Sequence, residues 1–355
     1  MRLSRTRAEQ GSDVKVLEIC GQTSTSKILI GEELRNLEKH VQSQKAVVIT
    51  DKNVNCLYHS QFPKYDVIEL GTGETIKTLE TVRFIYQKLI DLEVDRSSFI
   101  VGIGGGVVCD ISGFAASTYM RGLDFGYVAT TLLAQVDASV GGKTGVNFDG
   151  YKNMIGVFSQ PRFVICDPEL LKSLPQKEVR NGYAEIVKHA LIGAPRLFDA
   201  IESELNKALR LEPRFMTKLI AESVAVKVEV VKKDEKEKNK RRKLNFGHTF
   251  GHAIEKITGA CHGEAISLGM VIATDLSVRK GLLPENTADR IKDLLEKLGL
   301  PAKKEMDRAA VMEAVLKDKK KMGDRIHFVL IEDVGKSVIQ LITIKELESL
   351  FYDLR

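Results

Sequence analysis

The most constraining feature of this sequence is a short apolar segment that ends in glycines. Residues 98–103, SFIVGI, lead directly into Gly104, Gly105 and Gly106, and apolar residues then continue over 107–119. Such a short apolar run is typical of a strand buried on both faces, and glycines allow the backbone to turn sharply into a following helix. The segment therefore predicts strand, turn and helix, the unit from which parallel sheets are built.

The rest of the chain divides into two parts by its hydrophobic pattern. In the first part, strands are predicted at 45–50, 126–130 and 162–166, and a helix at 75–92. After Pro175, helical periodicity predominates to about residue 279 and returns at 285–298 and 308–319, followed by a strand pair at 326–331 and 337–341. We expect an α/β fold with two domains: an N-terminal, largely parallel α/β domain over 1–175 and a mostly α-helical C-terminal domain over 176–355.

Charge and cysteine content argue against several classes of protein. Lys and Arg number 53 and Asp and Glu 48, and the segment 232–243 alone carries the whole excess of +5. A nucleic-acid-binding surface would spread its positive charge, so no nucleic-acid partner is expected. The five scattered cysteines contain no CxxC pair, which disfavours a disulfide framework or a thiolate zinc site. No apolar run is long enough to span a bilayer, and the first residues do not resemble a secretory signal, so we expect a cytoplasmic protein without a membrane partner.

Three polar features each allow two interpretations. The glycines at 104–106 could bind a nucleotide phosphate through their N–H groups, or they could be there only because the tight turn from strand to helix requires glycine. Residues 130–147, in which Gly141 and Gly142 precede Lys143, could form a surface loop or, as we favour, a cradle for polar ligand groups. The basic segment 232–243 could be a solvated helix end or the wall of an anion pocket. Asp51, which ends the first strong strand, is a candidate for binding the ribose of NAD.

Glu185 lies in a helix whose neighbouring residues are apolar. A carboxylate in such surroundings costs several kcal/mol unless it is paired or bound to a metal. Lys188 and His189 follow at positions i+3 and i+4, so an ion pair within the helix is one explanation. A metal site is the other.

Three of the seven histidines fall within 18 residues, at 248, 252 and 262. His248 and His252 share one helix face, and their i,i+4 spacing alone would place both on one metal. His262 follows after Gly259, where the chain can fold back. With Glu185, these residues predict a zinc site of histidine and glutamate ligands with one open position, as in catalytic zinc centres.

Residues from about 45 to 335 resemble the 3-dehydroquinate synthase family of the sugar phosphate cyclases. The motifs that carry this resemblance are GGGVVCDISGF, YMRG, TTLLAQVDASVGGKTGVN, KNMIG, NGYAEIVKHALI, RKLNFGHTFGHAIE and HGEAISLGM. The resemblance implies a lyase of the shikimate pathway that uses NAD and zinc or cobalt. Its substrate would be 3-deoxy-D-arabino-heptulosonate 7-phosphate, and its products 3-dehydroquinate and phosphate. The steps would be transient oxidation by NAD, β-elimination of phosphate, re-reduction and intramolecular aldol closure.

The resemblance also implies roles for individual residues. The metal ligands would be Glu185, His248 and His262. His252 would instead be catalytic, in place of the pairing suggested by spacing, together with Lys143, Lys188, Arg241 and Asn245. Substrate would be bound by Asp137, Lys152, Asn153, Lys227, Glu237 and either Lys319 or Lys320. NAD would be bound by Asp51, Asn53, Glu74, Lys77, Gly105, Gly106, Asp110, Thr130, Thr131, Leu133, Ser173, Leu174 and Glu178. Arg121 would complete the substrate site of a second subunit, which implies a homodimer.

Other functions remain open at this point. Related cyclases make 2-deoxy-scyllo-inosose or 2-epi-5-epi-valiolone, but the retention of Lys152, Asn153, Lys188, Arg241 and Asn245 favours the dehydroquinate reaction. A metal-dependent polyol dehydrogenase would share the NAD and metal residues without needing so many cations. A non-catalytic NAD-binding scaffold is disfavoured by the complete set of metal-ligand types. One departure from the family pattern is Ala129, where proline is usual.

Overall fold

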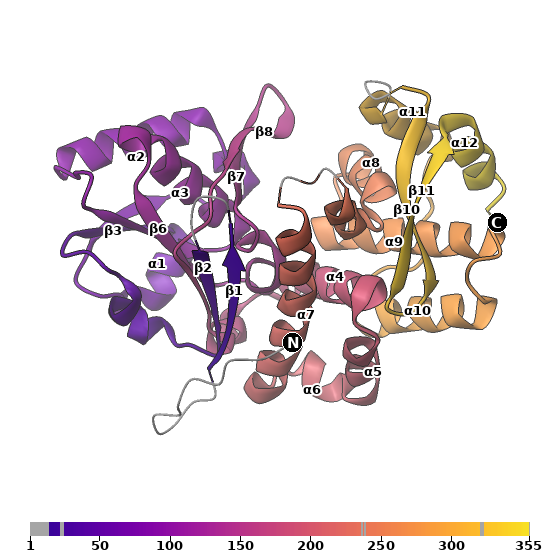
Figure 1. Ribbon diagram of the computed structural model, residues 1–355, viewed down its shortest axis with the longest axis horizontal. Helices are drawn as coiled ribbons and strands as arrows, with labels where there is room; N and C mark the ends of the chain where they lie inside the picture. Colours follow the sequence, from indigo (N-terminus) through magenta and orange to yellow (C-terminus); the bar gives the residue numbers. More distant parts are fainter. Residues whose placement is uncertain (1–13, 22–24, 236, 238, 320–322, 355) are drawn as a thin grey trace. The chain divides into compact units, whose positions relative to one another are not determined.

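The chain forms two compact units, Met1–Leu174 and Pro175–Arg355. The computed structural model (Figure 1) describes residues 14–21, 25–235, 237, 239–319 and 323–354. The predicted α/β class is confirmed, with strands concentrated in the first unit and helices in the second. Among the described residues, no helix is both long and apolar enough to cross a membrane.

A seven-stranded sheet forms the centre of the first unit. Its order is β1 (Lys15–Cys20), β2 (Thr25–Ile30), β9 (Phe163–Cys166), β6 (Asp124–Ala129), β5 (Phe99–Gly104), β3 (Ala46–Asp51) and β4 (Asp66–Leu70). All neighbouring strands run parallel except β1 and β2, which are antiparallel. The α-helices of this unit are α1 (Lys52–Tyr58), α2 (Leu79–Asp91) and α3 (Gly106–Thr118). A separate antiparallel hairpin consists of β7 (Lys143–Phe148) and β8 (Tyr151–Phe158).

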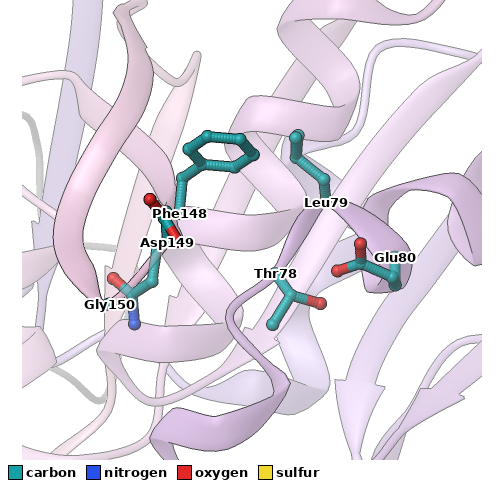
Figure 2. Close-up of a pocket in the computed structure, with 7 residues that line it drawn as sticks. Thr78, Leu79, Glu80, Phe148, Asp149 and Gly150 are labelled. Carbon is teal, nitrogen blue, oxygen red and sulfur yellow. The ribbon is translucent and has the colours of Figure 1, made fainter.

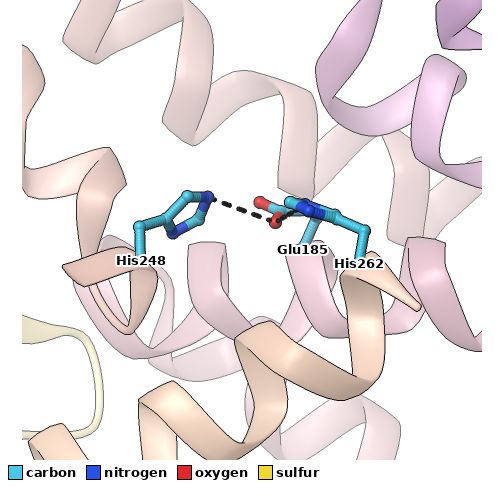
Figure 3. Close-up of side chains that lie close together, drawn as sticks. All are labelled: Glu185, His248 and His262. Atoms are coloured by element: carbon cyan, nitrogen blue, oxygen red, sulfur yellow. Dashed lines mark hydrogen bonds and ion pairs between the residues drawn. The ribbon is translucent and has the colours of Figure 1, made fainter. Parts of the chain in front are cut away.

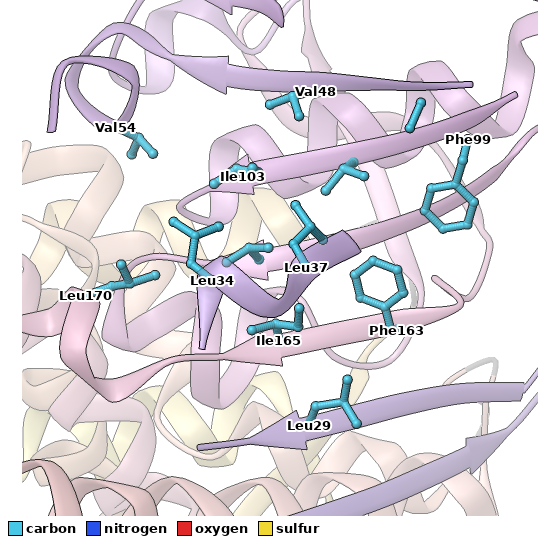
Figure 4. Close-up of a cluster of buried hydrophobic side chains, with 13 residues drawn as sticks. Leu29, Leu34, Leu37, Val48, Val54, Phe99, Ile103, Phe163, Ile165 and Leu170 are labelled. Carbon is cyan, nitrogen blue, oxygen red and sulfur yellow. The ribbon is translucent and has the colours of Figure 1, made fainter. Parts of the chain in front are cut away.

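Apolar side chains from β3, β5 and β9 form a core on one face of the sheet (Figure 4). Val48, Ile103 and Ile165 are buried there together with Leu34 and Leu37 of the 3-10 helix Leu34–His40. Burying each such side chain contributes about 1.5–3 kcal/mol. This core holds the strands of the sheet in place. The polar residues that follow the strand ends are therefore held in place as well.

The second unit is mainly helical. Its elements are α4 (Gln176–Gly193), α5 (Pro195–Ser203), α6 (Leu205–Leu209), α7 (Pro213–Lys233), the 3-10 helix Lys240–Asn245, α8 (His248–Thr258), α9 (His262–Arg279), α10 (Glu285–Lys297), α11 (Arg308–Lys319), β10 (Arg325–Asp333), β11 (Lys336–Thr343) and α12 (Ile344–Tyr352). Helices α4 and α9 are buried on nearly all sides over residues 181–192 and 265–274. They therefore form the interior of the unit, and a charged residue on either helix must find its partners there.

Two local expectations differ from the structure. The helix expected from residue 75 starts at Leu79, because Glu74–Ile76 form a separate 3-10 turn and the Thr78 hydroxyl accepts the N–H of Thr81 as a cap. The segment 130–147 is not a surface loop. Most of it is buried, and it contains the π-helical turn Ala134–Ala138 and the strand β7.

Candidate active site

Three side chains of the second unit converge on one point (Figure 3). Nε2 of His262 lies 3.3 Å and Nε2 of His248 lies 3.7 Å from Oε1 of Glu185. One ligand atom from each residue lies within 4.8 Å of the others. A carboxylate and two imidazoles at this spacing form a donor set suited to zinc or cobalt, and three protein ligands leave the fourth position of a tetrahedral ion for another group. The residues therefore fit a catalytic divalent cation.

Both histidines are the first residues of their helices, His248 of α8 and His262 of α9. The positive end of a helix dipole disfavours a protonated imidazole, and a metal ligand must be neutral. Burial, with the Lys188 charge second, holds the pKa of His248 well below its usual range. Nδ1 of His248 lies 3.1 Å from the Phe246 carbonyl. If Nδ1 donates to that carbonyl, Nε2 presents its lone pair to the cluster.

The ring of His262 lies between two carboxylates. Its Nε2 faces Glu185, and its Nδ1 lies 3.8 Å from Oε2 of Glu255 on α8. Burial alone would lower the pKa of His262, but Glu185 and Glu255 together raise it to about 9. A second carboxylate behind a ligating histidine is a common outer-shell arrangement in metal sites, where it holds the ring in place.

Glu185 and Lys188 form a fully buried ion pair one turn apart on α4. The ion pair expected within this helix is therefore present, and so is the convergence with the histidines. His189, the other residue expected to partner Glu185, is buried and has Nδ1 2.8 Å from the Ser223 hydroxyl. The carboxylate thus faces an ammonium on its own helix and two imidazoles on other helices.

Close backbone contacts bring the ligand-bearing helices together. A Cβ on Gly269 of α9 would lie 2.0 Å from the Gly247 carbonyl oxygen, immediately before His248. A Cβ on Gly263 would lie 2.5 Å from Cα of Asn181 on α4. The Asn181 side chain also accepts the N–H of Gly263 at 2.8 Å. These contacts hold the start of α9 against α4 and the start of α8 against α9.

The remaining predicted residues of the second unit take different positions. His252 is exposed, and its ring stands edge-on 5.2 Å from that of His248, outside the three-residue cluster. The metal pairing suggested by i,i+4 spacing is therefore not supported. Arg241 is 2 % exposed, so the basic segment is not merely a solvated helix end. Lys227 is also buried, and Asn245 donates to Glu237 at 2.7 Å. Lys319 ends α11, but its side chain and all of Lys320 lie outside the described residues.

A polar network joins several predicted residues of the first unit. The Lys77 ammonium donates to both Asp110 on α3 and the side-chain oxygen of Asn153 on β8. Asn147 on β7 donates to Glu74 at 2.8 Å and accepts the N–H of Asn153 at 2.9 Å. Residues proposed to bind NAD and a residue proposed to bind substrate are thus connected by hydrogen bonds.

A cavity of about 380 Å³ lies beside this network, between the start of α2 and the turn that joins β7 to β8 (Figure 2). The residues that line it are Thr78, Leu79, Glu80, Asn147, Phe148, Asp149 and Gly150. Asn147 belongs to both the network and the cavity wall. None of the other lining residues was predicted from the sequence to bind a ligand.

The glycine turn and Asp51 lie at the ends of neighbouring parallel strands. Gly105 precedes α3, and a Cβ there would lie 2.9 Å from the Thr131 side chain. The backbone at Gly105 therefore passes very close to the loop that follows β6. Asp51 accepts the N–H groups of Asn53 and Val54 as the cap of α1. Burial raises the pKa of Asp51 more than these hydrogen bonds lower it. Asp51 therefore has a structural role whether or not it also contacts a nucleotide.

The other predicted residues of NAD and substrate binding are distributed as follows. Half-buried residues are Gly106, Thr131, Leu133, Asp137, Leu174 and Glu178, and Thr130 is buried. Exposed residues are Asn53, Glu74, Arg121, Lys143, Lys152, Asn153 and Ser173. Leu133 and Asp137 flank or belong to the π-helical turn, a conformation often found at functional sites.

Comparison with known proteins decides the family. Residues 67–181 match the 3-dehydroquinate synthase N-terminal family and residues 182–321 match the 3-dehydroquinate synthase C-terminal family. A 3-dehydroquinate synthase of Halorhodospira halophila is 44 % identical over 311 residues, covering 85 % of this chain and 88 % of the relative. This chain belongs to the 3-dehydroquinate synthase family. The resemblance inferred from its motifs is confirmed.

Solved structures of related cyclases share the fold of this 3-dehydroquinate synthase family member. One is a 2-deoxy-scyllo-inosose synthase in complex with carbaglucose-6-phosphate, NAD⁺ and Co²⁺, with 28 % identity, a TM-score of 0.84 and coverage of 95 % of this chain and 99 % of that chain. Another is a 2-epi-5-epi-valiolone synthase from Streptomyces hygroscopicus with NAD⁺ and Zn²⁺, with 27 % identity, a TM-score of 0.83 and 98 % coverage of both chains.

Sequence reasoning missed two polar residues that contact the predicted site of this family member. Glu255 faces His262, and Asn181 binds the backbone beside it. Both lie within the motifs that carry the resemblance. Asn147, a polar residue of the predicted cradle at 130–147, joins the network of the first unit. The sequence alone does not single out Glu255 or Asn181, because their roles depend on contacts between different helices.

Proposed function

We propose that this chain converts 3-deoxy-D-arabino-heptulosonate 7-phosphate into 3-dehydroquinate and phosphate, with NAD and a divalent cation, as an enzyme of the cytoplasm. The observation that carries the proposal is the convergence of Glu185, His248 and His262 in a member of this family. When bound, the cation would polarise a substrate hydroxyl and NAD would accept and return a hydride. Zinc and cobalt both suit the donor set, and both occur in the related cyclases.

The chain's own residues would hold the substrate and its developing charge. Lys188, Lys227 and Arg241 are buried cations of the second unit, and such groups suit a phosphate or carboxylate brought out of water. Oxidation of one carbon makes the neighbouring proton acidic, which allows phosphate to leave by β-elimination. Reduction and aldol closure then complete the product. The protein would contribute by positioning groups and stabilising charge.

The decisive test uses far less NAD than substrate. Because the two redox steps cancel, phosphate and dehydroquinate should form one for one over many turnovers per NAD, while NADH stays near zero. Phosphate release, the carbocyclic product and NADH absorbance are measured together. NADH accumulating in step with substrate loss, without phosphate release, would show a polyol dehydrogenase instead. Phosphate release with a different cyclic product would show a related cyclase, and NAD binding without any turnover would indicate a scaffold.

We also propose that the enzyme is a homodimer in which Arg121 completes the partner's substrate site. Arg121 is exposed and has a φ of 71°, an uncommon conformation for a residue with a side chain. Met120 beside it and Phe148 and Met154 of the β7–β8 hairpin are large apolar side chains that are 43–54 % exposed. Exposed apolar residues of this size are typical of interaction surfaces, which supports the association of two copies.

Mixing two inactive variants tests this dimer. Arg121→Ala and Lys188→Ala should each lose activity, but a mixed dimer would contain one complete site. After random subunit exchange, about a quarter of the wild-type activity should return, because half of the dimers are mixed and each has one working site. The matched control mixes Lys188→Ala with Glu185→Gln, which damages the same site in both subunits and should restore nothing. Exchange without recovered activity in the first mixture would refute the shared site.

A further inference from the structure

The β7–β8 hairpin contains an irregularity at the two residues predicted to bind substrate. Val146 pairs with Ile155 and Phe148 pairs with Tyr151. One residue, Asn147, therefore lies between the pairs on β7, whereas three residues, 152–154, lie between them on β8. This is a β-bulge, a feature that often lies next to active sites and changes the direction of a side chain.

The bulge depends on an unusual backbone conformation. Asn153 has a φ of 52°, in the left-handed region that residues with side chains seldom adopt. Asparagine adopts this conformation more readily than most residues, and it persists only where neighbouring contacts enforce it. The contact here is the hydrogen bond from the Asn153 N–H to the side-chain oxygen of Asn147.

Asn147 also binds the segment that precedes α2. Its side-chain N–H₂ donates to Glu74, and its backbone N–H donates to the carbonyl of Lys77 at 2.8 Å. Lys77 in turn donates to the side-chain oxygen of Asn153. Asn147 and Lys77 thus both link the predicted cofactor segment to Asn153 of the bulge, and Asn147 also binds the Asn153 backbone.

We propose that Asn147 is a positioning residue that sets Asn153 for substrate and couples it to the cofactor segment at Glu74 and Lys77. This inference rests on the proposed function for its substrate. Its two side-chain bonds give it two separable effects: the oxygen holds the bulge, and the N–H₂ holds Glu74. Asn147 itself need not touch substrate.

Two variants separate these effects. Asn147→Ala removes both bonds, so the KM for the heptulosonate phosphate should rise about tenfold, the effect of losing roughly one positioned hydrogen bond. Asn147→Asp keeps an acceptor for the Asn153 N–H but places a carboxylate against Glu74. It should leave KM within about twofold while weakening NAD binding several-fold by like-charge repulsion. NAD affinity is measured by direct titration without substrate.

Three further measurements make the proposal falsifiable. Hydrogen exchange at the Asn153 amide should accelerate in Asn147→Ala and stay slow in Asn147→Asp. In the Asn153→Ala background, Asn147→Ala should change KM little further, because both changes act through one interaction. Asn36→Ala, which removes another amide–carboxylate hydrogen bond in the first unit, is the control and should change neither KM nor the exchange of Asn153.

The failure of this proposal can be told apart from that of the proposed function. If the wild-type protein does not turn over the heptulosonate phosphate, the function fails, while hydrogen exchange and NAD titration still test Asn147. Unchanged exchange at Asn153 in Asn147→Ala would overturn the positioning role. The positioning role would also be overturned if the rise in KM in the double variant equalled the product of the rises in Asn147→Ala and Asn153→Ala. Asn147 would then act independently of Asn153.

Discussion

Glu185→Gln will leave the protein almost free of metal and inactive. An amide oxygen cannot replace the anionic ligand, and the buried Lys188 loses its counter-charge. Changes to outer-shell residues of metal sites alone cost about 10–100-fold in affinity, so loss of this ligand should exceed about 100-fold. Zinc content after dialysis, cobalt affinity by competition with a chelator, and phosphate release should all fall together.

Two companion variants separate metal loss from unfolding. Glu185→Asp keeps the charge beside Lys188 and withdraws the carboxylate by one methylene, so it should fold but bind metal more weakly. Glu264→Gln removes another acid near the start of α9 that is outside the cluster, and should keep its metal. Full metal occupancy in a folded Glu185→Gln would refute the assigned ligand.

Gly269→Ala will destabilise the second unit and weaken metal binding. The added methyl would lie 2.0 Å from the Gly247 carbonyl oxygen and 2.7 Å from the Gly251 nitrogen. These are backbone atoms, so no rotamer change relieves the clash, and α8 must move away from α9. Overpacking usually costs up to about 3 kcal/mol of folding free energy, and a clash with backbone atoms should reach that upper value. For a unit of this size, that corresponds to a fall in melting temperature of roughly 6–12 °C.

The matched control for this change is Gly193→Ala, at the last residue of α4. Its methyl would lie 3.2 Å from a side-chain atom of Val226, which can adjust. We expect a change of less than about 1 kcal/mol, since alanine is also the better helix former. Thermal melting and chelator competition measure both variants. A Gly269→Ala protein that melts and binds cobalt like the wild type would show that this helix contact does not set the site.

Local periodicity predicts four of the five interior strands of the sheet. Strands β3, β5, β6 and β9 are continuous apolar runs, and the structure places them side by side. Three strands of the sheet are not predicted: β1 and β4, which form its two edges, and β2, which lies beside β1. Polar residues interrupt all three segments, so they lack the continuous apolar run by which the other strands are predicted. The β7–β8 hairpin was missed because its many small polar residues carry no clear period of two.

The sequence alone predicts a metal site of Glu185 and histidines, but the choice of His248 and His262 as the two histidine ligands rests on the family resemblance. Spacing alone favoured His248 with His252, because a helix places both on one face. Which face meets Glu185 depends on how the starts of α8 and α9 approach α4, and the close contacts at Gly263 and Gly269 decide this. These contacts join residues 82 apart (Asn181 and Gly263) and 22 apart (Gly247 and Gly269), so they leave no local pattern in the sequence.

The spread of the three ligands along the chain links folding to metal supply. Glu185 and His262 are 77 residues apart and come from different helices. An ion bound by both would hold together segments that drift far apart when the unit unfolds, and the unfolded chain would have no such site. Free metal at 100 times its dissociation constant would therefore add about 2.7 kcal/mol to the free energy of unfolding. In a cell poor in that metal, the same protein would be easier to unfold and to degrade, even before any substrate is considered.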